Sequence, residues 1–216
     1  MRNFITNEWF TVFTILALIA VVGAKHVNTL RFNDFLSVIG NSKYLKIYTK
    51  DQKFVDVFDG FLFINLVISG SIFLFLSYSV LISPLDFELT PFLKLLLAFS
   101  TIIIIKTLFE RLIGSLFEID TIIDNYLFQK TTFKNYSGLV FLVANLFLLY
   151  TKSFAEIIII AIFSVICLIN GIGFITSFKN HQKTLKPNFF YFLLYLCALE
   201  IAPYVLLYKV ISEYNA

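Results

Sequence analysis

Six long apolar runs constrain the fold of this chain more than any other feature of its sequence. They cover residues about 9–24, 60–83, 91–112, 137–151, 155–178 and 189–209. A run of about 20 apolar residues is long enough to cross a bilayer as a helix. Within the bilayer, a helix satisfies all of its own backbone polar groups. The sequence therefore predicts an all-α integral membrane protein, a bundle of about six transmembrane helices.

The composition of the chain agrees with this fold class. Hydrophobic residues make up 59% of its 216 residues and charged residues only 14%, against roughly 25% charged residues in soluble domains. No polar stretch is long enough for a second domain, so residues 1–216 are expected to form a single polytopic membrane domain. The net charge of +3 is small and lies in loops, which gives no support to nucleic acid as a partner.

Basic residues flank the apolar runs unevenly, and this predicts the orientation of the chain. Of the 17 Lys and Arg residues, twelve lie in the connections that follow the first, third and fifth runs, and four lie on the opposite side of the membrane, where the chain begins. The twelve are Lys25, Arg31, Lys43, Lys46, Lys50, Lys53, Arg111, Lys130, Lys134, Lys179, Lys183 and Lys186. Because cytoplasmic loops carry the excess of Lys and Arg, we expect the three basic connections in the cytoplasm and both termini on the opposite side of the membrane.

The segment 25–58 is the longest connection and is predicted to be a cytoplasmic interfacial loop. Asn28 can cap a short amphipathic helix that ends at Gly40 and Asn41. Its basic side chains would face anionic lipid on the inner membrane surface, or the loop would serve as a docking surface for a partner. Residues 118–128 also have helical apolar spacing, and are expected to prolong the third helix or to lie along the surface.

Glu200 is the strongest candidate for a functional residue, because it is a single carboxylate near the middle of the last apolar run. At that depth an acid costs about 2.5–3.5 kcal/mol on insertion scales and needs a partner, a proton or a water-filled cavity. Pro203 follows three residues later and loosens the helix, since it lacks an amide hydrogen.

The third run carries Lys106, Glu110 and Arg111. Lys106 and Glu110 are four residues apart, so they share a helix face and can pair, while Arg111 can extend to the cytoplasmic interface. Lys106 is also within reach of Glu200 in an antiparallel neighbour. The charges then form a structural pair, contact another subunit, or act as a relay for an ion or substrate.

Asn145 and Asn170 add amides to the fourth and fifth runs. Amides between membrane helices serve as hydrogen-bonding contacts, and the glycines beside Asn170 favour close packing. These two residues complete the set of intramembrane polar residues with a predicted structural or functional role.

Motifs of enzyme chemistry are missing from the chain. The sequence has no HExxH, no Gly-x-Ser-x-Gly and no phosphate-binding glycine loop. His26 and His181 lie in separate connections. We therefore expect no catalytic, cofactor-binding or metal-binding residues, and a protein that is not an enzyme.

Three segments resemble a known family. Leu193–Lys209, with Leu-Glu-Ile-Ala-Pro at its centre, is similar to the C-terminal signature of the Bacteroidota membrane-protein family catalogued as domain of unknown function 4271. The segments Ile122–Lys130 and Asn7–Phe10 also look like that family. The resemblance implies an inner-membrane protein of about this length, with Glu200 and Pro203 in its most specific segment, and it carries over no catalytic residue.

These features favour a non-enzymatic multi-pass inner-membrane subunit or scaffold that acts through helix–helix contacts, for example in an envelope secretion or motility complex. Its expected partners are the lipid bilayer and either another membrane protein or a second copy of the chain. The alternative is a small transporter or proton-coupled channel that uses Glu200.

Overall fold

The computed structural model describes residues 5–41, 43–49, 56–82, 87–116, 120–150 and 155–185, and the regular structure within these ranges is helical. It consists of α1 (Ile5–Val27), α2 (Thr29–Leu36), α3 (Lys43–Tyr48), α4 (Val57–Leu81), α5 (Leu89–Leu116), α6 (Asp120–Tyr150) and α7 (Ala155–Leu185). Among these, α1, α4, α5, α6 and α7 are long and apolar enough to cross a membrane. The predicted sixth span, 189–209, lies outside the described residues.

Side chains that cap backbone amides set the starts of two helices. Oδ1 of Asn28 accepts a hydrogen bond from the amide of Arg31 at 2.9 Å, which caps α2 as the sequence predicted. Oδ1 of Asp56 accepts from the amide of Phe58 at 3.2 Å at the start of α4. Each cap satisfies one of the amides that a helix start leaves without a partner.

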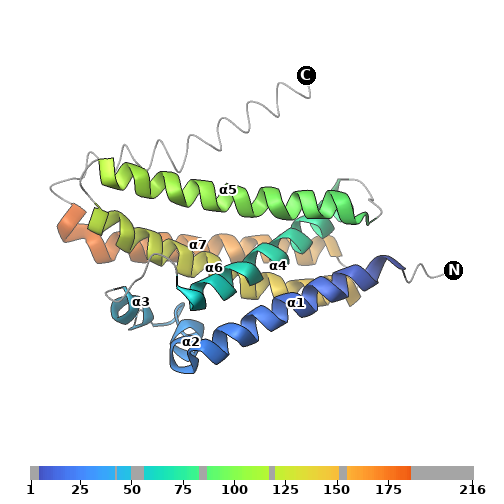
Figure 1. Cartoon of the computed structure of the whole chain (residues 1–216), viewed down its shortest axis with the longest axis horizontal. Helices are drawn as coiled ribbons and strands as arrows, with labels where there is room; N and C mark the ends of the chain where they lie inside the picture. The colour runs from blue at the N-terminus through green and yellow to red at the C-terminus, as the bar shows by residue number, and fades with distance from the viewer. Residues whose placement is uncertain are drawn as a thin grey trace, which may run out of the picture.

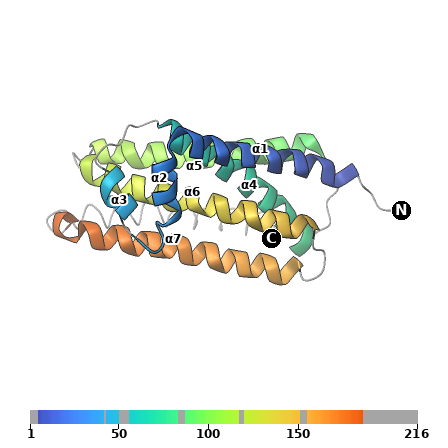
Figure 2. The same ribbon diagram turned by 90° about the horizontal axis from the view of Figure 1, so that it is seen from below.

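The five long helices lie side by side and alternate in direction along the bundle (Figure 1). The short helices α2 and α3 lie at the same end of the bundle as the end of α5, the start of α6 and the end of α7 (Figures 1 and 2). We call this end the α2/α3 end. The basic loops of the predicted cytoplasmic side thus gather at one end of the fold.

Helix α4 is the most buried of the long helices. In the most apolar stretch of α4, 61% of the residues are buried, compared with 6% in that of α5 and 11% in that of α7. Phe73 of α4 packs on Phe141 of α6, with 4.8 Å between ring centres. Helices α4 and α6 approach closely at Gly138, where a Cβ atom would lie only 2.8 Å from Cα of Leu66. The core of the bundle therefore lies along the α4–α6 contact.

The segment 25–58 is more than an interfacial loop. Phe35 of α2 and Tyr44 of α3 are fully buried, and both belong to one apolar cluster with Phe58 of α4 and Phe128 of α6. The ring of Tyr44 stacks on that of Phe128, with 5.8 Å between centres. Aromatic side chains thus anchor α2 and α3 against the end of the bundle.

A second expectation needs correction at the start of α6. Residues 120–128 do not prolong the third helix; they form the first turns of the next one. The helix that contains the predicted span 137–151 therefore begins at Asp120. The packing of Ile123 against Gly114 of α5, where a Cβ atom would lie only 2.9 Å from the Ile123 side chain, explains why the chain turns back here.

Candidate functional site: buried polar contacts between the helices

A buried ion pair joins α5 to α6. Nζ of Lys130 donates to Oε1 of Glu110 at 2.5 Å, and Glu110 is 1% exposed. The ammonium group of Lys130 also lies 5.5 Å from the ring centre of Tyr126, one turn earlier in α6. The structure therefore gives Glu110 a partner in the next helix, while the pairing with Lys106 that the spacing along the sequence allows stays a prediction.

The other charged residues of the third run are less deeply placed. Nε of Arg111 lies 3.4 Å from Oδ1 of Asp124, with both side chains about two-fifths exposed (39% and 44%). An exposed pair of this kind contributes little to stability. Lys106 is half-buried on α5, one turn before Glu110. Its predicted partner Glu200 and the nearby Pro203 lie outside the described residues, so this contact stays a prediction.

Arg31 is the centre of a second charged cluster, at the α2/α3 end. Its guanidinium donates to Oδ2 of Asp59 at 2.7 Å, to Asp56, and to the hydroxyl of Tyr44 at 3.3 Å. It also lies 4.5 Å from the ring centre of Phe58. With 11% of its side chain exposed, Arg31 ties α2 and α3 to the start of α4. Its guanidinium is thus enclosed by these groups, whereas one interpretation of the loop had placed its basic side chains toward anionic lipid.

The surroundings of this cluster hold Arg31 charged and Tyr44 neutral. Burial by itself lowers the pKa of the guanidinium, but Tyr44 and the carboxylate of Asp59 outweigh it, and the pKa of Arg31 is raised. Burial raises the pKa of the Tyr44 phenol, and the negative charge of Asp59 adds to this against the opposing effect of Arg31. The cluster therefore works as a fixed electrostatic contact at neutral pH.

Amide contacts connect α4 to α6 and α6 to α7. Nδ2 of Asn145 donates to the backbone carbonyl of Ser69 at 2.8 Å, and Oγ of Ser69 donates to Oδ1 of Asn65 at 3.2 Å. Nδ2 of Asn170 donates to Oγ of Ser137 at 3.1 Å and to a carbonyl of its own helix at 2.9 Å. Both predicted amides thus take part in hydrogen bonds that cross from one helix to another.

Several buried polar atoms of α4 and α6 have no hydrogen-bond partner in the part of the chain that the structure describes. They are Nδ2 of Asn65, Oγ of Ser71 and Ser77, Oε1 of Gln129, both amide atoms of Asn135 and Oδ1 of Asn145. A buried polar atom without a partner costs about 1–3 kcal/mol. Among the described residues, the buried side chains that carry this cost all belong to α4 or α6.

Sequence reasoning missed the roles of Arg31 and Lys130, which it counted as loop cations. One signal was available for Arg31: Asp56 and Asp59 stand three residues apart at the start of an apolar helix. Such acids share a helix face and need a cation nearby when the helix packs. No comparable local signal marked Lys130.

Among the described residues, no three His, Cys, Asp or Glu side chains gather closely enough to hold a metal ion. The polar groups therefore form two ion-paired clusters and a set of amide contacts. Together they tie α5 to α6, α2 and α3 to α4, and both α4 and α7 to α6.

Comparison with known proteins gives a family. Neither a curated protein nor a solved structure matches the chain. The sequence model of one family matches residues 10–211, which include all described helices except the first five residues of α1. The chain therefore belongs to the family described as Domain of unknown function (DUF4271).

Proposed function

We propose that this chain is a non-enzymatic, multi-pass subunit or scaffold of the bacterial inner membrane that acts through helix–helix contacts. An envelope complex for secretion or motility is its proposed setting. The observation that carries the proposal is the outward surface of α5. This helix of 28 residues buries only Phe92, Glu110 and Gly114.

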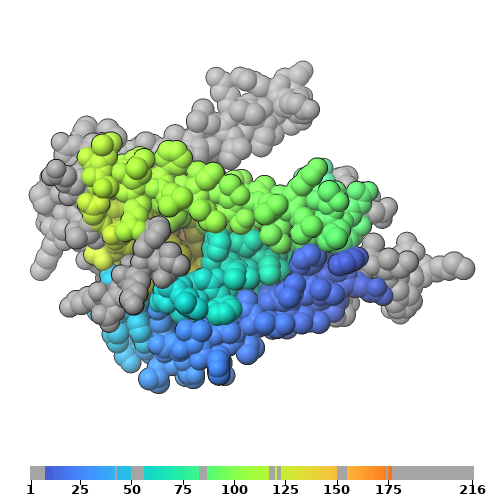
Figure 3. All heavy atoms as spheres, in the orientation of Figure 1, coloured from blue at the N-terminus to red at the C-terminus, as the bar shows by residue number. Residues whose placement is uncertain are grey.

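The surface of α5 is long enough for a second transmembrane helix. At 1.5 Å per residue, 28 residues extend about 42 Å, which exceeds the roughly 30 Å of the hydrocarbon core. The outward side chains are large and apolar, and they include Leu97, Ile104 and Leu112 at 63%, 46% and 64% exposure. Figure 3 shows α5 as a ridge along the whole length of the bundle on that face.

The buried polar groups support a scaffold because they serve internal contacts. Glu110 holds α6 through Lys130, and Arg31 holds α4 through Asp59. Such contacts fix how the helices are rotated relative to one another, and so keep the outward face of α5 in one orientation. A partner helix packs specifically against a face that presents the same side chains in the same positions.

We infer a periplasmic placement of both termini from the basic residues that gather at the α2/α3 end, which we assign to the cytoplasm, together with the predicted sixth span 189–209. Reporter fusions at Ala216 and within 37–42 test this assignment. The fusion at Ala216 should report a periplasmic location and the other a cytoplasmic one. The reverse pattern would overturn the orientation but leave the scaffold role open to its own test.

Site-specific photo-crosslinking in cells tests the scaffold role. A photoreactive residue at Leu97 or Leu112 of α5 should give a discrete protein adduct, either with a different membrane protein or with a second copy. The same residue at Phe92, which is fully buried, is the control and should give only crosslinks within the chain. If Leu97 and Leu112 give lipid adducts alone and the protein purifies as a single copy, the scaffold proposal fails.

A second candidate function is a small transporter or proton-coupled channel in which Glu200 titrates. The buried polar atoms of Asn65, Asn135 and Asn145 that have no partner among the described residues favour it, because a path for ions or water needs such groups. Proteoliposomes should then show a pH-dependent flux that Glu200→Gln abolishes. Glu156→Gln, at an exposed position in the first turn of α7, is the control and should keep that flux.

A further inference from the structure

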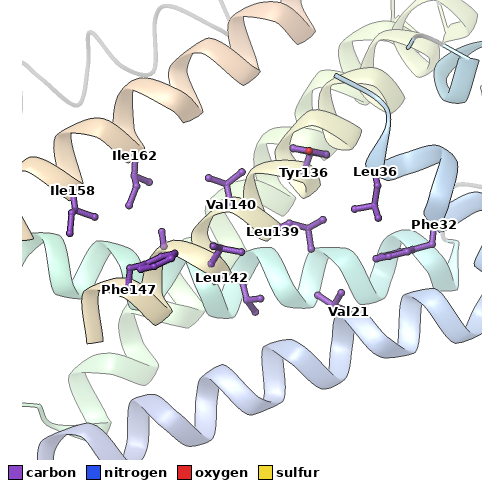
Figure 4. A pocket seen from close by; sticks show the side chains of 12 residues that line it. Val21, Phe32, Leu36, Tyr136, Leu139, Val140, Leu142, Phe147, Ile158 and Ile162 are labelled. Carbon is purple, nitrogen blue, oxygen red and sulfur yellow. The ribbon is translucent and has the colours of Figure 1, made fainter. Parts of the chain in front are cut away.

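An apolar groove lies on the surface where α1, α2, α6 and α7 meet. Its volume is about 690 Å³, and all of its lining side chains except Tyr136 are hydrocarbon or aromatic without a polar atom. Val21 of α1 and Phe32 of α2 line one end, and Phe147 of α6 and Ile158 of α7 line the other (Figure 4). A groove of this size is within the usual range for small-molecule sites, about 300–1,000 Å³.

The groove is too short for a transmembrane helix. Along α6 it extends from Tyr136 to Phe147, which is about 16 Å at 1.5 Å per residue. A partner helix needs contact over the roughly 30 Å of the hydrocarbon core, whereas a single leaflet is about half as thick. Helix α2 lies across the groove end, with Phe32 and Leu36 in its lining (Figure 4), so a straight helix cannot pass through.

The charge at the α2 end of the groove suits an anionic headgroup. Lys25 lies one helical turn beyond Val21 on the same face of α1, and it is exposed. Its long side chain can thus reach the groove end that α2 closes, at the level where we place the cytoplasmic headgroups. A lysine at this position is attracted to anionic lipids of the inner leaflet.

We propose that this groove binds one acyl chain of an anionic glycerophospholipid, with the phosphate beside Lys25 at the α2 end. The chain fills an apolar volume about one leaflet long, and the headgroup lies over α2. The inference rests on membrane placement of the protein, as the proposed function does, but not on the scaffold role. Groove and α5 surface involve different helices, so the two proposals can fail separately.

The test uses the full chain, purified in mild detergent, and native mass spectrometry with added phosphatidylglycerol or phosphatidylcholine. Wild-type protein should retain one phosphatidylglycerol per chain. Val143→Trp places a large side chain on the groove wall at a half-exposed position, and should weaken retention about tenfold or more. Lys25→Gln should weaken phosphatidylglycerol binding and bring it to the level of phosphatidylcholine.

Val12→Trp is the matched control, because Val12 of α1 is the same residue type and about as exposed, at 47% against 51% for Val143, but does not line the groove; it should bind lipid like the wild type. Thermal unfolding of each variant checks that the fold is intact. Equal retention by Val143→Trp and Val12→Trp would overturn the proposal. So would a second copy or a protein partner that protects Val143 from labelling in lipid-free detergent, since the groove would then have a different occupant.

Discussion

Nζ of Lys130 lies 2.5 Å from Oε1 of Glu110, although 20 residues separate the two in the chain. The pair holds the end of α5 against the first turns of α6, close to the point where Ile123 packs on Gly114. Glu110 is almost completely buried and Lys130 nearly so, with side-chain exposures of 1% and 14%. At this depth Lys130 provides charge compensation for the carboxylate.

Removal of one partner should therefore destabilise the protein strongly. Lys130→Met leaves Glu110 buried without its cation, and the expected loss is on the order of 3–5 kcal/mol. The double variant Lys130→Met with Glu110→Met removes both charges, so it should recover most of the loss. The measurement is the unfolding free energy in detergent for both single variants and the double variant. Additive losses would show that the two residues do not act as a pair.

The Arg31 cluster should control how firmly α2 and α3 are held. In Arg31→Met, Asp56 and Asp59 lose their common donor, and we expect a loss near the lower end of about 3–5 kcal/mol, since both carboxylates keep some exposure. Hydrogen exchange within residues 29–49 should increase more than in α6. Lys43→Met is the control, because its contact with Asp34 spans 3.6 Å and its side chain is 59% exposed; its effect should be below about 1 kcal/mol.

Gly138 should not tolerate a side chain. A Cβ atom there would lie 2.8 Å from Cα of Leu66, which is backbone of α4 and cannot rotate away. Gly138→Ala should force α4 and α6 apart and lower stability by about 1–3 kcal/mol. Gly171→Ala is the matched control, since a Cβ atom meets nothing within 4 Å there. Thermal unfolding in detergent compares the two, and an equal effect at both sites would contradict the packing argument.

Tyr44 should make stability depend on pH above neutrality. The pKa of its phenol is raised in the folded protein, first by burial and then by Asp59, whereas an unfolded chain has a phenol pKa of about 10. The contribution of Tyr44 is thus fully present below pH about 10 and falls as the pH rises further, because only the unfolded chain releases the proton.

Melting temperatures between pH 9 and 11.5 check this sign. The wild type should lose stability more steeply above pH 10 than Tyr44→Phe does. Tyr78→Phe, at an exposed position of α4, should keep the wild-type slope. Parallel curves for the wild type and Tyr44→Phe would mean that Tyr44 ionises equally easily in both states.

Much of the fold can be predicted from the local sequence. The runs 60–83, 91–112 and 155–178 begin within three residues of the starts of α4, α5 and α7, because apolar length and composition are properties of each segment alone. The cap at Asn28 is equally local. Membership of the family was also recognisable from short segments, and the match over residues 10–211 confirms it.

The errors concern segments of mixed character. Residues 120–128 mix two acids and one amide with isoleucine, leucine and aromatic residues, which is typical both of a surface helix and of the end of a membrane helix. Packing of Ile123 on Gly114 decides that they begin α6. Similarly, the aromatic residues of 25–58 are of a kind that also lies at membrane surfaces. In the structure, Phe35 and Tyr44 are buried in an apolar cluster of the bundle.

The sequence by itself thus determined that this chain folds into long apolar helices with few charges, since helix formation and membrane length depend on neighbouring residues. Only the tertiary structure decided which charges meet. Glu110 pairs with Lys130 and Arg31 with Asp59 because helix rotation and the closeness of α5 to α6 and of α2 to α4 bring them together. Rotation and approach depend on side chains far apart in the chain, and no local pattern encodes them.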